Sequence, residues 1–141
     1  MCLDNSYGIM LDIIYGIENL EAFKQLLETN PGLLFIKFSA DWCVPCKKIK
    51  EHTDAWFARM PDNVQVVIVD IDESFEVYAF LKNKKMVAGI PTILAYNQGN
   101  LNYPFDESVS SSDKNMVDKF FNKCLGIAVN DGITFPLYLR K

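Results

Sequence analysis

Apolar and polar residues follow one another in a pattern that predicts alternating strands and helices. The run at residues 33–38 is apolar except for Lys37, which is typical of a strand covered on both faces. Residues 64–71 are rich in β-branched side chains and follow a turn signal, which also predicts a strand. Neighbouring segments such as 73–83 carry apolar residues at the spacing of amphipathic helices. The pattern as a whole predicts strands at 9–15, 33–38, 64–71, 86–96 and 101–105, and helices at 18–29, 49–60, 73–83 and 114–125.

The predicted order of elements is β-α-β-α-β-α-β-β-α. Right-handed crossovers of such units build one central sheet with helices on both faces, so we expect an α/β fold. Residues 97–100 supply the turn of a hairpin between the last two strands, and a serine-rich loop follows at 106–113. The length of 141 residues suits a single domain.

The end of the chain is predicted to lie outside this domain. We place the domain at 1–125 and a C-terminal extension at 126–141. Within the extension, Asn130-Asp131-Gly132 divides two short apolar runs, which predicts a hairpin. The extension either packs on the domain or docks a partner, and the sequence does not choose between them.

Composition narrows the possible partners and compartments. Half of the residues are hydrophobic and 13% are aromatic, which favours a packed core over disorder. A net charge of −4 argues against a nucleic-acid partner. No apolar run reaches the roughly 18 residues that span a membrane, and no lysine or arginine precedes Lys24, so we expect neither a membrane anchor nor a secretory signal. The expected location is cytoplasmic.

Two cysteines supply the most informative chemistry. Cys43 and Cys46 stand where the apolar run 33–38 passes into a predicted helix. A thiol at a helix start lies near unpaired backbone N–H groups, whose partial positive charge favours the thiolate. Cysteines three residues apart on one helical turn share a face, so their sulfurs can meet. When one thiolate attacks a disulfide, the other lies within reach to resolve the mixed disulfide.

A zinc site is the alternative use of Cys43 and Cys46. A structural zinc ion needs four ligands, and Cys2, Cys124 and His52 are the remaining candidates. None of them forms a second close pair, so we expect no metal. His52 lies about 240° around the predicted helix from Cys46, which indicates a solvent-exposed residue. Cys124 follows apolar residues at core spacing, which favours buried packing.

A second motif, Gly89-Ile90-Pro91-Thr92, stands where the segment 86–96 leads into the fourth predicted strand. This motif, the Cys-Val-Pro-Cys motif and the order of elements together resemble the thioredoxin family over residues 9–125. The resemblance implies the thioredoxin fold, with a central mixed sheet of about five strands flanked by about four helices. It also implies thiol–disulfide exchange, in which Cys43 is the nucleophile and Cys46 the resolving thiol.

The resemblance assigns a substrate site as well. Trp42 matches the tryptophan that flanks the active site of the family, and Val44 lies beside the attacking sulfur. Pro91 matches a proline whose preceding peptide bond is cis and which lies opposite the cysteines. The backbone of Ile90 matches the residue that hydrogen-bonds the substrate chain. We therefore expect Trp42, Val44, Ile90 and Pro91 to contact substrate.

The sequence departs from the family pattern at several positions. Val44 replaces the usual glycine, and Glu51 replaces a proline that commonly kinks the helix. Lys37 stands where the family often keeps a buried aspartate, and Ile68 replaces the lysine near it. Because a charged group is rarely left alone in a covered strand, Lys37 needs an explanation.

Three interpretations of Lys37 remain open. Its ammonium group pairs with Asp70 on the neighbouring strand, or it loses its proton readily and accepts one from Cys46, or its stem is buried while its head reaches water. The first two interpretations make Lys37 a residue that tunes the thiolates or transfers protons at the second thiol.

We therefore expect a protein-disulfide reductase that needs no cofactor beyond its redox-active Cys43–Cys46 disulfide. Its expected partners are disulfide-containing proteins and a separate reductase, because the sequence contains no nucleotide-binding motif. A disulfide isomerase or oxidase of the same fold is one alternative, since direction depends on the reduction potential. An interaction module with vestigial redox activity is the other.

Overall fold

The computed structural model describes residues 10–132 and has the predicted order of elements. Most boundaries lie within a few residues of the prediction. The strands and helices are β1 Ile14–Tyr15, α1 Leu20–Glu28, β2 Leu33–Ser39, α2 Val44–Phe57, β3 Val64–Asp70, α3 Phe75–Asn83, β4 Thr92–Asn97, β5 Glu107–Val109 and α4 Lys114–Gly132.

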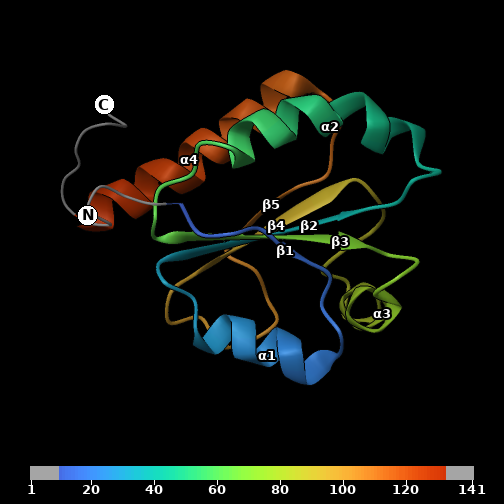
Figure 1. Ribbon diagram of the computed structural model, residues 1–141, viewed down its shortest axis with the longest axis horizontal. Helices are drawn as coiled ribbons and strands as arrows, with labels where there is room; N and C mark the ends of the chain where they lie inside the picture. Colours follow the sequence, from blue (N-terminus) through green and yellow to red (C-terminus); the bar gives the residue numbers. More distant parts are fainter. Residues whose placement is uncertain (1–9, 133–141) are drawn as a thin grey trace.

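The strands form one mixed sheet in the order β1-β3-β2-β4-β5. The first three are parallel, whereas β4 and β5 are antiparallel to their neighbours. Helices α1 and α3 cover one face, and α2 and α4 cover the other (Figure 1). This arrangement confirms the fold expected from the resemblance.

Strand β2 lies at the centre and alternates its side chains between two cores. Leu34 and Phe38 face α1 and α3, where Phe38 packs against Tyr78 with ring centroids 5.7 Å apart. Phe35 faces α2 and α4 and contacts Phe57 and Phe121. By the same alternation, Lys37 projects to the α2 face. The strand that leads into the cysteine motif is therefore held on both faces.

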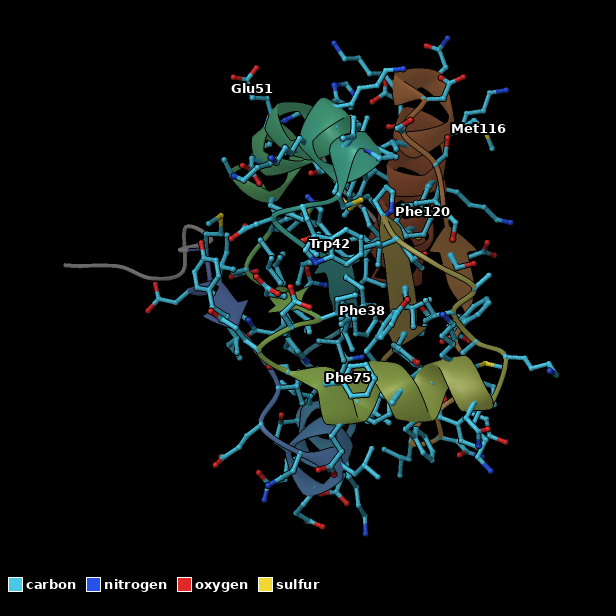
Figure 2. All side chains as sticks on the ribbon, turned by 90° about the vertical axis from the view of Figure 1, so that its right-hand side faces the viewer. Phe38, Trp42, Glu51, Phe75, Met116 and Phe120 are labelled. Atoms are coloured by element: carbon cyan, nitrogen blue, oxygen red, sulfur yellow. A yellow bond between two sulfur atoms is a disulfide. The ribbon has the colours of Figure 1, made fainter. Side chains whose placement is uncertain are left out.

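A polar contact joins α2 to α4. The His52 Nε2 and the Trp56 Nε1 atoms lie 2.6 and 2.8 Å from the same Asp118 carboxylate oxygen. His52 is therefore half-buried beside α4 and engaged with Asp118, rather than fully solvent-exposed as predicted. Glu51 is exposed on α2 and points away from the sheet (Figure 2).

The hairpin after β4 differs from the prediction. The strand expected at 86–96 begins only at Thr92, and the segment 101–105 forms a loop. Asn100 closes this loop by donating from its side-chain amide to the Pro104 carbonyl and to the Asp106 carboxylate. The partner of β4 is therefore β5, which lies inside the predicted serine-rich loop.

Helix α4 is longer than predicted and continues to Gly132. The predicted hairpin is thus wrong as far as residue 132, and residues 133–141 lie outside the described part. Extending an existing helix adds one hydrogen bond for each ordered residue, whereas a separate hairpin must form its own nucleus. Among residues 10–132, no helix is long and apolar enough to cross a membrane.

Candidate active site

The two cysteines of the motif lie at the start of α2. Cys43 is the N-cap residue, and its Sγ atom accepts a hydrogen bond from the backbone N–H of Cys46 at 3.2 Å. Pro45 stands in the first turn, where a missing N–H costs nothing. A disulfide joins Cys43 to Cys46, and both residues are buried. The Cys43 sulfur therefore occupies the position where helix N–H groups stabilise negative charge.

The loop before β4 brings a backbone carbonyl to the sulfur. The Ile90 oxygen lies 3.9 Å from the Cys43 Sγ, and the Ile90–Pro91 peptide bond is cis, as the resemblance implied. The Thr92 hydroxyl fixes the loop by donating to the Gly89 carbonyl at 2.6 Å. This places Ile90 and Pro91 opposite the cysteines.

Trp42 and Val44 flank the disulfide and are open to solvent, with exposed fractions of 63% and 73%. The Trp42 indole N–H donates to the Asp72 carboxylate at 2.9 Å. The backbone N–H of Asp72 in turn donates to the Asp70 side chain at 2.8 Å. Trp42 is thus held by the turn that follows β3, while its ring stays accessible.

Lys37 is buried beneath α2 and only 3% exposed. Its Nζ atom donates to the Thr53 hydroxyl at 2.8 Å, and that hydroxyl donates to the Lys50 carbonyl at 3.0 Å. The interpretation that Lys37 pairs with Asp70 is wrong, because the Lys37 Nζ atom binds Thr53 and forms no ion pair with Asp70. The interpretation that the lysine head reaches bulk water is also wrong.

The surroundings of Lys37 disfavour its charge. Burial lowers the pKa of the Lys37 ammonium group below its usual range, although the nearby Asp54 carboxylate acts in the opposite direction. Asp54 is itself engaged in an ion pair with Lys50 at 2.6 Å. Lys50 further lowers the pKa of Lys37 through repulsion.

Lys37 and Cys46 line the same cleft. The cleft has a volume of about 420 Å³ and runs between α2 and the ends of the strands. Its wall also carries Asp41, Lys50, Asp54 and Asp70. Lys37 and Cys46 therefore border the same space, which is large enough to hold solvent.

The other described thiol is not part of this site. Cys124 lies on α4 and is buried, as predicted, and burial raises the pKa of its thiol to about 12. Cys2 lies outside the described residues. Between residues 10 and 132 there is no group of three or more His, Cys, Asp or Glu side chains that could hold a metal ion.

Several supporting residues were not identified from the sequence. Thr53 and Asp72 contact Lys37 and Trp42, and the Ser110 hydroxyl lies 2.7 Å from that of Thr92. These residues lie on separate segments of the chain, in α2 and in the loops after β3 and β5, and no local sequence pattern signals the contacts. Among these contacts, only that of Lys37 could be anticipated from the sequence, because a buried lysine requires a polar partner.

Comparisons with known proteins agree with this geometry. The Thioredoxin family model matches residues 16–123. Thioredoxin from Bacillus subtilis is 32% identical over 98 residues, which cover 70% of this chain and 88% of that protein. Thioredoxin 3 from Plasmodium falciparum is 30% identical over 115 residues, which cover 80% of this chain but 61% of that protein. The crystal structure of a Plasmodium falciparum thioredoxin superimposes with a TM-score of 0.62 at 25% identity, covering 83% and 93% of the two chains.

The lowered pKa of Lys37 predicts how stability depends on pH. At a pH below the pKa that Lys37 has in the folded protein, its amine is protonated in both the folded and the unfolded protein. As the pH rises from there towards the unfolded value of about 10.4, only the folded state loses the proton, so the free energy of unfolding increases. The difference in this free energy between wild type and Lys37→Met should therefore grow in favour of wild type with rising pH in denaturant titrations. Lys48→Met, at an exposed position on α2, controls for the lost charge. A pH-independent difference for Lys37→Met would contradict the burial of a charged amine.

Proposed function

Because this chain belongs to the thioredoxin family of thiol–disulfide oxidoreductases, we propose that it reduces protein disulfides through Cys43 and Cys46. The observation that carries the proposal is the hydrogen bond from the Cys46 N–H to the Cys43 Sγ at the start of α2. This donor and the helix N-terminus favour the Cys43 thiolate, which is the attacking species.

The reaction consists of two exchanges. The Cys43 thiolate attacks one substrate sulfur, the substrate S–S bond breaks, and the leaving thiolate takes up a proton. Cys46 then loses its proton and attacks the Cys43 Sγ, which releases the second substrate thiolate. Two electrons pass to the substrate, and the protein is left with the Cys43–Cys46 disulfide.

The substrate chain lies beside the Ile90 carbonyl in this proposal. Its position 3.9 Å from the Cys43 Sγ supports this placement, because a carbonyl there can accept a hydrogen bond from an extended substrate segment. Pro91 follows Ile90 in the same loop, directly before β4. Trp42 and Val44 offer exposed apolar surface on the other side of the disulfide. These four residues form the proposed substrate site.

A separate reductase returns electrons to the disulfide in each cycle. The protein itself needs no cofactor, because both exchanges use only sulfur atoms and protons. We place the protein in the cytoplasm, which is a reducing compartment. We also assign residues 126–141 to an extension beyond the redox domain.

Lys37 assists the second exchange. The Cys46 thiol must lose a proton before it attacks, and the cleft that it shares with Lys37 lets solvent carry this proton. The buried amine, whose pKa is lowered by burial, serves as an acceptor when neutral and stabilises the Cys46 thiolate when charged. Lys37 is therefore a positioning and proton-handling residue in this proposal.

The assignment of the nucleophile predicts different reactivities for the two thiols. In Cys46→Ser, the remaining Cys43 should react with iodoacetamide at a lower pH than Cys46 does in Cys43→Ser, because only Cys43 caps the helix. Cys43→Ser should lose all disulfide reduction, whereas Cys46→Ser should accumulate a mixed disulfide. The assignment is refuted if Cys46 alone reacts at low pH.

The proposed role of Lys37 predicts a slower second exchange. In Lys37→Met, the release of substrate thiol from a preformed mixed disulfide should slow about tenfold at neutral pH, and its pH midpoint should move upward. Stopped-flow measurement across pH tests this, with Lys48→Met as the control. An unchanged pH profile in folded Lys37→Met protein would remove Lys37 from the mechanism.

A further inference from the structure

A second exposed aromatic residue lies on the active-site face. Phe75 is the first residue of α3 and is 61% exposed, nearly as much as Trp42. Figure 2 shows Trp42 and Phe75 on the face turned towards the viewer. A single exposed apolar residue needs no explanation. Two exposed aromatic rings on the face that carries a redox disulfide indicate that both contact a binding partner.

A short turn connects the two rings. The Trp42 indole is bound to Asp72, and Phe75 follows Asp72 by three residues. The backbone N–H of Ser74 donates to the Asp70 carbonyl at 2.9 Å, which closes the turn between them. The Ser74 hydroxyl also accepts a hydrogen bond from the Ile17 N–H at 3.2 Å. The start of α3 is therefore fixed relative to Trp42.

The Phe75 ring rests on the core. Its centroid lies 6.4 Å from that of Tyr78, and Tyr78 lies 5.7 Å from Phe38 in the central strand. Tyr78 and Phe38 are buried, so the exposed ring has a rigid base. A ring that is already ordered loses little conformational entropy when a partner covers it.

Acidic side chains surround Phe75. Asp72, Glu73 and Glu76 are all exposed. None of the three forms an ion pair with another residue of the described part of the chain. Asp72 binds the Trp42 indole, and Glu76 accepts a hydrogen bond from the Leu20 N–H, which leaves Glu73 the most available of the three. A protein that binds this surface therefore contacts the apolar rings of Trp42 and Phe75 and the carboxylates next to them.

We propose that Trp42 and Phe75, which we call the aromatic surface, select the substrates of the redox site. The occupant is a polypeptide segment beside the target disulfide that carries an apolar side chain next to a cationic one. The apolar side chain covers the rings, and the cation pairs with Glu73. The inference rests on the proposed function, because the surface acts on the same exchange at Cys43. A second copy of this chain fits less well, since it would bring the same acidic side chains together.

Single-turnover kinetics test this proposal. Pre-reduced protein, freed of excess reductant, is mixed with three disulfides, and the second-order rate constant is followed by quenched-flow alkylation. Two are disulfide-bridged peptides that differ only in a Phe-Arg or a Phe-Glu pair next to one cysteine, and the third is 2-hydroxyethyl disulfide. The variants are Phe75→Ser and Glu73→Lys. Leu101→Ser, at a residue that is 62% exposed on the loop between β4 and β5, is the matched control.

The proposal predicts a distinct result for each variant. Phe75→Ser should lower the rate constant for both peptides about tenfold and leave 2-hydroxyethyl disulfide unchanged. Glu73→Lys should reverse a preference of about threefold for the Arg peptide over the Glu peptide, and added salt should weaken that preference. Leu101→Ser should behave as wild type.

Other results would overturn the inference. If Phe75→Ser affects the peptides no more than Leu101→Ser does, the aromatic surface selects no substrate. If Phe75→Ser instead changes only the sedimentation coefficient, the surface joins two copies of the chain. Failure of the proposed function is distinguishable, because wild type would then not reduce 2-hydroxyethyl disulfide at all.

Discussion

The burial of β2 on both faces is the constraint on which the rest of the structure depends. This strand pairs with β3 on one edge and β4 on the other, and residues 33–38 are all buried. Its end therefore has a fixed position, and α2 starts five residues later with Cys43 as its cap. The register between β2 and β4 also sets where the Ile90 loop enters the sheet. Strand β2 thus brings the Cys43 sulfur and the Ile90 carbonyl to opposite sides of the site, and the Thr92 hydroxyl fixes the loop that carries the carbonyl.

Lys37 is the exception within this strand. Every neighbour from 33 to 38 is apolar, and a buried amine costs more free energy than a methionine of similar shape. Thr53 satisfies one of its donors, and Asp54 offsets part of the unfavourable burial. Packing alone would favour an apolar residue at this position, and the cleft that Lys37 shares with Cys46 supports the proposed role of Lys37 in the exchange reaction.

The sequence was sufficient to predict the fold and to identify the two motifs that meet at the site. Apolar runs and helical spacing are local signals, and they placed Cys43 at a helix start and Pro91 before a strand. The partners of Lys37, Trp42 and His52 could not be predicted, because each contact joins segments that are distant along the chain. The end of α4 was missed for a different reason. A turn-like Asn-Asp-Gly sequence also occurs at the end of a helix, and only cooperativity with the preceding turns decides between the two.

The proposed transfer of electrons from Cys43 and Cys46 to substrate disulfides requires a strongly reducing dithiol. The direct measurement is the reduction potential of this pair, obtained by equilibration with glutathione buffers and alkylation of the free thiols. Mapping the alkylated positions separates this pair from the buried Cys124 and from Cys2. We expect a potential below about −230 mV, at which the dithiol reduces most exposed disulfides. A value near or above about −180 mV, in the range of isomerases and oxidases, would contradict it.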